Sequence, residues 1–197
     1  ALGRLSNYNE SIGYFDSGAI EIISIIFIIL GSIHFLAYIK FLIGNKAIFT
    51  TDTQIRSFIK IIIFSTIILF IYLLFQKNNI ADVGLRAVIF NVVSILTGTG
   101  YVTQEFDNWG SFALIFFLVL MFIGGCAGST ACGIKIFRIQ ILYLFFINQL
   151  KKVIYPRGIF IIKYDNNNVD NKFMSSTVSF IYLYIIIFFL LSALTVY

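Results

Sequence analysis

Residues 97–101 read Thr-Gly-Thr-Gly-Tyr, and their types and spacing suit the binding of an ion. Glycine adopts left-handed backbone angles without steric cost, and threonine adds a hydroxyl without bulk. Such a run lets successive carbonyl oxygens point at one place, where a stack of carbonyls replaces the hydration shell of potassium. The pentapeptide alone fits a glycine-rich turn between two helices equally well. The expected ligands are Thr97, Gly98, Thr99, Gly100 and Tyr101, with K+ at the first four.

Two neighbouring features favour an ion site over a plain turn. Residues 83–96 are apolar but too few to cross a hydrocarbon core, which needs about 20 residues of helix. Their length suits a re-entrant helix that enters from one side. Two acidic residues, Glu105 and Asp107, follow the pentapeptide. Carboxylates at the mouth of a pore gather cations, so an outward-facing mouth is expected here.

The composition shows in which environment this site has to work. Of the 197 residues, 59% are apolar, 18% are aromatic and only 12% are charged, whereas soluble domains have about 45–50% apolar and about 25% charged residues. These proportions exclude a soluble enzyme, a disordered tail and a nucleic-acid binder. The chain has no Ser/His/Asp set, no HExxH motif and one histidine, so we expect no enzyme. The sequence predicts an all-α membrane protein in contact with lipid.

Apolar segments long enough for the membrane recur along the chain. Residues 22–39 and residues 58–75 are expected to form the first two spans, with Lys60 snorkelling to the surface. Residues 173–197 are expected to form the last span. Residues 111–150 are also largely apolar, but a helix there should break in its middle at four glycines: Gly124, Gly125, Gly128 and Gly133.

The loop charges set the expected orientation, because Lys and Arg concentrate on the cytoplasmic side of a membrane. The formal net charge is +5. Basic residues gather in residues 40–60 and in residues 135–172, so both regions are expected to be cytoplasmic. The remaining loops hold more acidic than basic residues and should face outward. The polar stretch of residues 163–172 is interpreted as a solvated linker.

Two phrases of the sequence resemble one membrane family. The runs VVSILTGTGY (92–101) and FIGGCAGSTACGIKIFR (122–138) resemble the third repeat of the TrkH/KtrB family of potassium transporters. SIGYFDS (11–17) resembles the segment after the family's second filter, so the similarity covers essentially the whole chain. The family implies four M1-P-M2 pore-loop repeats around one pore. Each repeat has a re-entrant pore helix, and the M2 helix of the third repeat is broken.

The resemblance implies a division of the chain. Residues 1–45 resemble the end of the second repeat, and residues 55–148 resemble the complete third repeat. A cytoplasmic linker, 149–172, leads to residues 173–197, which resemble the first helix of the fourth repeat. Residues 97–101 would be the selectivity filter and residues 124–133 an intramembrane gating loop. The implied gating residues are Gly124, Gly125, Cys126, Ala127, Gly128, Ser129, Thr130, Gly133 and Lys135.

The chain departs from the family pattern at two places. The stretch ALGRL offers only Gly3, beside Arg4, where the family carries a glycine-containing filter, so no second filter is claimed. Ala131 and Cys132 stand where the family pattern has glycines. Because β-carbons restrict the backbone, the gating loop should be stiffer or differently packed. Cys126 and Cys132 form neither a CxxC pair nor a zinc set, and we interpret them as small packing residues.

Four single residues need a separate interpretation. At Gly100 a side chain would intrude on the ion path. Lys135 either opposes cation passage beneath the pore, as the resemblance suggests, or is an interfacial snorkelling lysine. His34 has no acidic partner three or four residues away, so it is expected to be a packing residue and not a proton relay. Glu21 is explained by the preference for acidic residues in the first turn of a helix.

The leading hypothesis is potassium transport across a bacterial cytoplasmic (inner) membrane by a multi-pass subunit. The family implies a homodimer of full-length pore subunits and a cytosolic nucleotide-binding regulatory subunit similar to TrkA or KtrA. Potassium is then the transported ion, and no cofactor and no nucleic acid are expected. The alternative hypothesis is a non-conducting, truncated fragment that needs the remaining repeats, because one filter of four cannot encircle an ion.

Overall fold

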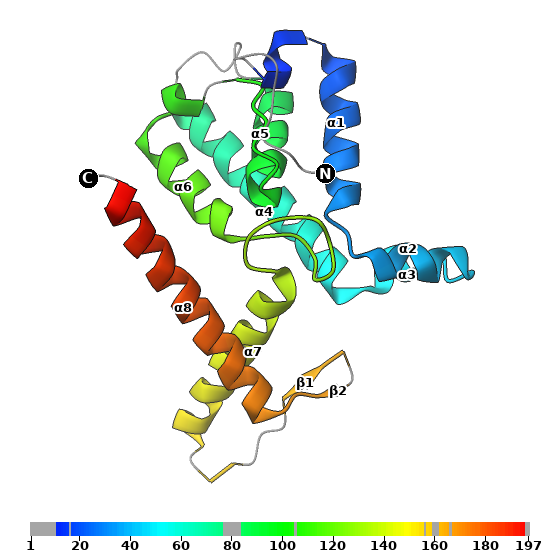
Figure 1. Cartoon of the computed structure of the whole chain (residues 1–197), viewed down its shortest axis with the longest axis vertical. Helices are drawn as coiled ribbons and strands as arrows, with labels where there is room; N and C mark the ends of the chain where they lie inside the picture. The colour runs from blue at the N-terminus through cyan, green and yellow to red at the C-terminus, as the bar shows by residue number, and fades with distance from the viewer. Residues whose placement is uncertain are drawn as a thin grey trace. The chain divides into compact units, whose positions relative to one another are not determined.

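The structure is a computed structural model that describes residues 11–15, 17–76, 84–104, 106–155, 157–158, 162–165 and 167–195. The expectations for Gly3, Arg4 and Glu105 lie outside the described residues. The chain divides into two compact units, residues 1–136 and residues 137–197. Most of α7 (Ile136–Ile154) therefore groups with the C-terminal unit. The elements of both units carry the labels of Figure 1.

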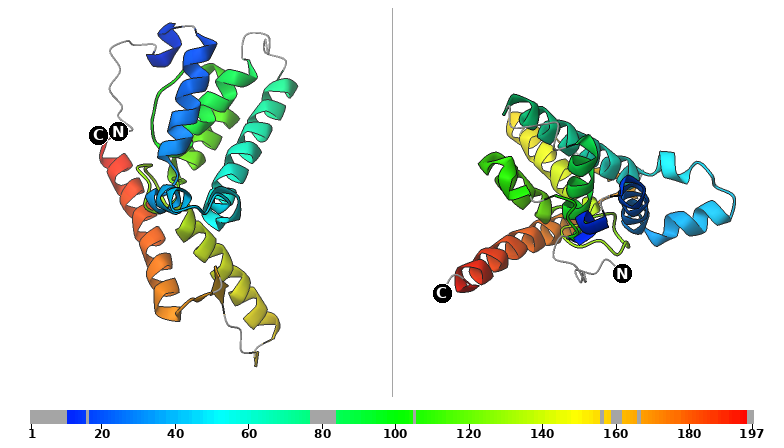
Figure 2. Two further views of the ribbon diagram at one scale, coloured as in Figure 1. Left: turned by 90° about the vertical axis from the view of Figure 1, so that its right-hand side faces the viewer. Right: turned by 90° about the horizontal axis from the view of Figure 1, so that it is seen from above.

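A short helix, α5 (Leu85–Thr97), is the centre of the first unit. It contacts α1, α4 and α6 (Figures 1 and 2), and ten of its 13 residues are buried. The structure therefore confirms a short helix before residues 97–101. The other elements of this unit are η1 (Ser11–Phe15), α1 (Gly18–Gly31), α2 (Phe35–Leu42), α3 (Ile48–Thr51), α4 (Thr53–Phe75), η2 (Phe106–Trp109) and α6 (Ser111–Phe122).

Residues 22–39, expected to form one transmembrane helix, are divided between two helices. The helix ends at Gly31, and α2 begins at Phe35 with its axis bent by 90°. A Gly-Ser pair is a common place for a helix to kink, and Gly31 and Ser32 form such a pair. Apolar composition alone did not reveal the break, because the residues on both sides of it are as apolar as a continuous span.

Two described helices, α4 and α8 (Asn171–Thr195), are long and apolar enough to cross a membrane. The bent pair α1 and α2 passes the same criterion if the two helices count as one span. Asp52 caps the start of α4, since its carboxylate accepts from the backbone N–H groups of Gln54 and Ile55 at 2.9 and 3.1 Å. This cap begins α4 five residues earlier than the expected span. The full number of spans stays a prediction.

The second unit consists of α7, a short hairpin and α8. The hairpin pairs β1 (Lys163–Tyr164) with β2 (Asn167–Asn168) in antiparallel register, so part of the expected linker is ordered. The Arg138 guanidinium lies 3.6 Å from the centre of the Phe180 ring, a cation–π contact that joins α7 to α8. Most side chains of α8 are exposed apolar groups, as expected of a helix in lipid.

Candidate ion site

The segment Thr97–Tyr101, named here the TGTGY segment, begins as the C-terminal cap of α5. Gly98 adopts a left-handed backbone, with φ of 73°. The N–H of Gly98 donates to the Ile95 carbonyl at 3.0 Å, and the N–H of Thr99 donates to the Ser94 carbonyl at 2.9 Å. These two bonds are those of a Schellman motif, which ends a helix at a glycine. The turn interpretation therefore holds for Gly98.

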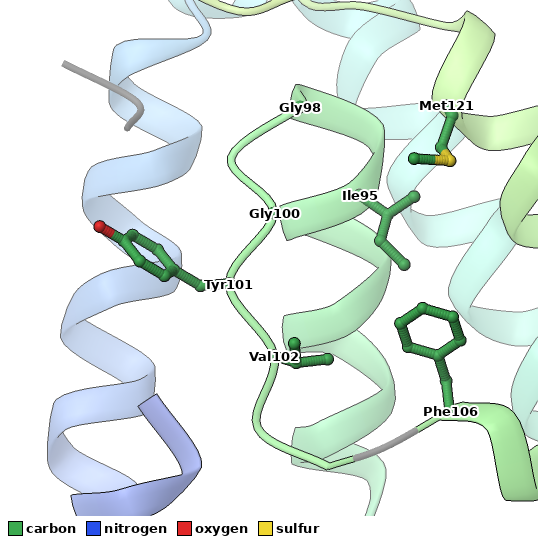
Figure 3. Close-up of a pocket in the computed structure, with 7 residues that line it drawn as sticks. All are labelled: Ile95, Gly98, Gly100, Tyr101, Val102, Phe106 and Met121. Carbon is green, nitrogen blue, oxygen red and sulfur yellow. The ribbon is translucent and has the colours of Figure 1, made fainter. Parts of the chain in front are cut away.

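Beyond the cap, the segment leaves a row of carbonyl groups unpaired. Gly100 is a second left-handed glycine, with φ of 77°. Among the described residues, no hydrogen bond ends on the carbonyl oxygens of Gly98, Thr99 or Gly100. Thr99 is buried, Gly98 is half-buried and Gly100 is exposed, and a buried carbonyl without a partner is costly unless another group satisfies it. Three consecutive carbonyls are thus available for a cation. Figure 3 shows this backbone running back beside α5.

The hydroxyl groups of the segment bind the protein itself. The Thr97 hydroxyl donates to the Val93 carbonyl at 2.8 Å, and it lies 2.7 Å from the Thr99 hydroxyl. Both threonines are buried. The Ser94 hydroxyl donates to the Tyr101 carbonyl at 2.6 Å, so this last carbonyl of the segment is turned toward α5. The threonine side chains therefore fix the loop, and the expected role as ligands remains for backbone oxygens.

A fully buried asparagine on α5 holds the chain that leaves the segment. The side-chain amide of Asn91 donates to the Gln104 carbonyl at 3.1 Å, and its oxygen accepts from the Thr103 N–H at 3.3 Å. Asn91 and Ser94 are polar residues among apolar neighbours in the middle of α5, and sequence analysis did not single them out. Their position on the buried face of a short helix is the signal that could have found them.

The segment SIGYF also lies against this exit. The Ser11 hydroxyl accepts from the Val102 N–H, and the Gly13 N–H donates to the Val102 carbonyl, both at 3.3 Å. A β-carbon on Gly13 would lie 2.5 Å from the Thr103 carbonyl oxygen, so only glycine fits there. Residues that resemble the end of the second repeat thus brace the segment of the third.

An ion pair joins α1 to the start of α5. The Glu21 carboxylate is buried and lies 2.5 Å from the Nε atom of Arg86, whose side chain is half exposed. Glu21 is in the first turn of α1, as expected from the helix dipole. Sequence analysis missed its partner, because Arg86 is distant in the chain. On the other side of the segment, Asp107 is exposed.

The helix break expected at the glycines is present between α6 and α7. The loop Gly124–Gly133, named here the glycine loop, is closed at its base by backbone bonds. The Gly124 N–H donates to the Ile134 carbonyl at 2.9 Å, and the Ile134 N–H donates to the Phe122 carbonyl at 2.8 Å. A β-carbon on Gly124 would lie only 2.0 Å from the Cys132 carbonyl oxygen. Glycine is therefore required for this closure.

The glycine loop is bound to the break between α1 and α2. The Cys126 N–H donates to the Ser32 carbonyl at 3.0 Å, and the Thr130 hydroxyl donates to the Gly31 carbonyl at 2.9 Å. The Phe35 N–H in turn donates to the Gly128 carbonyl at 3.2 Å. The loop therefore satisfies backbone groups that the kink leaves without helical partners.

A second attachment comes from the first turn of α4. The Ala127 N–H donates to the side-chain oxygen of Gln54 at 3.0 Å. Nearby, the buried Nε2 of His34 lies 3.6 Å from the second carboxylate oxygen of Asp52. His34 packs in the interior as expected, but at the kink and beside an acidic residue of another helix. Sequence spacing along one helix had excluded such a partner.

Lys135 turns back onto the glycine loop. Its ammonium group donates to the Ser129 carbonyl at 3.3 Å and to the Ala131 carbonyl. The Ser129 hydroxyl donates to the Cys126 carbonyl at 2.7 Å, which tightens the same turn. The lysine thus has a positive charge within the loop and two local acceptors. This geometry differs from that of a snorkelling lysine, whose head group lies in water.

The glycine loop also contacts the TGTGY segment. The Cys132 N–H donates to the Thr97 carbonyl at 3.1 Å. A β-carbon on Gly98 would lie 2.7 Å from the Cys132 β-carbon, so the two residues are closely packed. Both cysteines are free thiols, and Cys126 is buried as expected of a packing residue. Cys132, for which the same role is expected, has an exposed side chain although its β-carbon packs against Gly98.

A cavity of about 410 Å³ lies on the α6 side of the segment (Figure 3). Gly98 and Gly100 border it with their backbone. The other described residues of the lining are Ile95, Tyr101, Val102, Phe106 and Met121, and none of these side chains is charged.

These features define a class of protein: an all-α membrane protein that holds an irregular, glycine-bearing segment against a buried short helix. Irregular backbone at membrane depth is tolerated only where protein encloses it or where it lines a cavity. Residues 2–195 match the TrkH family, described as cation transport protein. The chain belongs to this family, which is a family of transporters and not of enzymes.

Individual relatives agree with this assignment. The chain is 33% identical over 181 residues to the Trk system potassium uptake protein TrkI of Halomonas elongata, covering 91% of this chain and 37% of that protein. It is 29% identical over 193 residues to the Trk system potassium uptake protein TrkH of Escherichia coli K12, and the match covers 95% of this chain and 39% of that protein. The crystal structure of the potassium transporter TrkH from Vibrio parahaemolyticus superposes on this chain with a TM-score of 0.88 at 30% sequence identity. The superposition covers 96% of this chain and 41% of that one. The chain spans about two fifths of these proteins.

Proposed function

We propose that the chain is part of a potassium uptake subunit in which the TGTGY segment binds the ion during passage. The observation that carries this proposal is the row of unpaired carbonyls at Gly98, Thr99 and Gly100. Carbonyl oxygens are the ligands that replace water around potassium. The C-terminal end of α5, with its partial negative charge, lies at the start of this row and further favours a cation.

The ligand set is narrower than the five residues of the segment. The Thr97 carbonyl already accepts from Cys132, and the Tyr101 carbonyl accepts from Ser94. With these two engaged, Gly98, Thr99 and Gly100 provide the ligands in the described arrangement. Buried Asn91 and Ser94 act as positioning residues, because they fix the backbone that carries the ligands.

The glycine loop is proposed as the gate of this path. It contacts the TGTGY segment at Thr97 and Gly98, and it is attached to two other helices through hydrogen bonds. A loop with several separate, breakable attachments has discrete bound and released arrangements, which is what a gate requires. The proposed gating residues are those that the resemblance implied.

The cellular setting follows from the family and from the loop charges. We place the subunit in a bacterial inner membrane as a multi-pass protein, with residues 40–60 and 135–172 on the cytoplasmic side. The relatives carry the name Trk system, and a homodimer of full-length pore subunits with a cytosolic nucleotide-binding regulator is proposed as the working assembly.

The alternative is that this chain does not conduct by itself. It spans about two fifths of its relatives, and a single TGTGY segment does not surround an ion. In that case the proposed ion ligands act only together with further pore-loop repeats. The two hypotheses share the same site and differ in what completes the ring of carbonyls around it.

Rubidium uptake by bacteria that lack their own potassium uptake systems tests the proposal. Gly100→Ser should reduce uptake at least tenfold, because a side chain enters the ion path and a left-handed backbone costs about 1–2 kcal/mol for a non-glycine residue. Gly84→Ser is the matched control, since Gly84 has open space around it and lies at a helix N-cap that accepts serine.

The outcomes separate the hypotheses once membrane insertion of each variant has been verified. Uptake that only Gly100→Ser abolishes supports conduction through the TGTGY segment. Equal uptake by Gly100→Ser and Gly84→Ser would contradict the proposed site. An inserted chain without uptake would refute conduction by this chain alone and favour the alternative.

A further inference from the structure

The direct bond between the glycine loop and the TGTGY segment has a chemical consequence. The Thr97 carbonyl belongs to the same run of backbone as the three unpaired carbonyls, yet it accepts from the Cys132 N–H at 3.1 Å. An N–H group presents a partial positive charge to the oxygen. A cation at the same oxygen meets that charge at close range, where little water is present to screen it.

We propose that Cys132 is the positioning residue through which the glycine loop controls the ion ligands. When the loop is docked, its N–H occupies the Thr97 carbonyl, and the loop-facing end of the ion site lacks one ligand. When the loop withdraws, that carbonyl becomes available to the ion. This inference rests on the proposed function, because it assumes that the TGTGY segment binds potassium.

The side chain of Cys132 strengthens the docked arrangement. Its β-carbon packs against Gly98, where an added β-carbon would approach to 2.7 Å. The neighbouring residue, Ala131, is held by the Lys135 ammonium group through its carbonyl. The contact is therefore supported from the loop side and from the side of the segment. A glycine at position 132 would keep the N–H donor and lose the packing.

Ion binding and loop docking then oppose each other at Thr97. By thermodynamic linkage, a group that weakens ion binding is itself displaced by the ion to the same extent. Higher potassium should release Cys132 from Gly98, whereas an ion that the carbonyls do not coordinate should leave the loop docked. Cys132 is a free thiol that reagents reach from solvent. In the docked loop it packs against Gly98, so loss of this contact should speed its labelling.

The test measures the rate at which a charged thiol reagent labels Cys132 in membranes that contain the chain. Cys126→Ala leaves Cys132 as the only thiol in the sequence. We expect labelling about fivefold faster in potassium than in sodium at equal ionic strength, the lower end of typical coupling. The Gly100→Ser substitution should remove this difference. A control chain with Cys132→Ala and Ser175→Cys carries an exposed thiol in the other unit and should label equally in both salts.

A second measurement isolates the N–H group. Cys132→Ala keeps the donor and the β-carbon, Cys132→Gly keeps only the donor, and Cys132→Pro removes the donor. The proline variant should raise uptake at low rubidium by lowering the apparent KM, whereas a merely damaged loop would lower the maximal rate. Cys132→Ala should resemble the unsubstituted chain.

The results distinguish this inference from the proposed function. Equal labelling in potassium and sodium, with rubidium uptake intact, would overturn the role of Cys132 and leave the ion site standing. Equal labelling together with absent uptake would overturn the role of Cys132 and refute conduction by this chain alone. A potassium effect that persists in Gly100→Ser would also overturn the inference, because the ion would then act elsewhere.

Discussion

The Glu21 carboxylate on α1 lies 2.5 Å from the Arg86 guanidinium at the beginning of α5. The two residues of this ion pair differ in environment, since the Glu21 side chain is 8% exposed and the Arg86 side chain is 50% exposed. The pair connects α1 to the short helix that precedes the proposed ion ligands. It therefore fixes where α5 begins relative to α1.

We predict that Arg86→Gln destabilises the protein more than Glu21→Gln does. Loss of the arginine leaves a buried carboxylate without its counter-charge, whereas loss of the carboxylate leaves an arginine that water hydrates. A broken buried pair costs about 3–5 kcal/mol, and exposure of Arg86 to solvent reduces this to about 2 kcal/mol. Thermal unfolding in detergent measures the difference, with Arg56→Gln as an exposed control.

The double variant Glu21→Gln with Arg86→Gln completes this test. It should be more stable than Arg86→Gln alone, because the second change removes the unpaired charge. If the loss of stability in the double variant equals the sum of the losses in the two single variants, the two side chains do not interact.

Asn91 offers a separate test of the backbone that carries the proposed ion ligands. Asn91→Leu removes both bonds to the exit of the segment and leaves the Gln104 carbonyl and the Thr103 N–H without this partner. We expect discrimination between rubidium and sodium to fall about tenfold, equivalent to about 1.4 kcal/mol, within the range for losing a buried bond. Rubidium uptake measured in the presence of competing sodium gives this discrimination.

Asn91→Asp is the conservative comparison for this substitution. It keeps the acceptor for Thr103 and loses the donor to Gln104, so an intermediate loss of discrimination is expected. Unchanged selectivity in Asn91→Leu, with normal insertion, would show that the asparagine does not position the ion ligands.

The sequence predicted the local features of the site well. The short helix before residue 97, the left-handed glycines at 98 and 100, and the interruption after residue 122 are all present. Each depends on properties of residues close in the chain, such as apolar length and glycine's freedom of φ. Local patterns therefore located the TGTGY segment and the glycine loop before the structure did.

The sequence did not predict features that depend on distant partners. The kink after Gly31 is supported by Thr130 and Cys126, which come from the glycine loop. The acidic neighbour of His34 is Asp52, the cap of another helix. Such pairs form only once the chain has packed, so neither hydrophobic periodicity nor spacing along one helix predicts them.

The sequence left two interpretations of Lys135 open: a charge that opposes cation passage, or a lysine that snorkels to the membrane surface. Substitutions at this position distinguish them. If its charge and its bonds to Ser129 and Ala131 keep the glycine loop docked, Lys135→Met should raise basal rubidium uptake severalfold. Lys135→Arg keeps the positive charge and should stay near the basal rate. Uptake unchanged in Lys135→Met would indicate that these bonds do not hold the glycine loop docked.

Gly124 provides the strictest steric test of loop closure. Its added β-carbon would lie 2.0 Å from the Cys132 carbonyl oxygen, a distance that no docked loop tolerates. Gly124→Ala should therefore hold the glycine loop away from the TGTGY segment, raise basal rubidium uptake and abolish the potassium dependence of Cys132 labelling. Gly84→Ala, with open space around the site, should change neither. Because the clash acts through Cys132, normal gating in an inserted Gly124→Ala chain would show that the docked loop is not the closed state of the path.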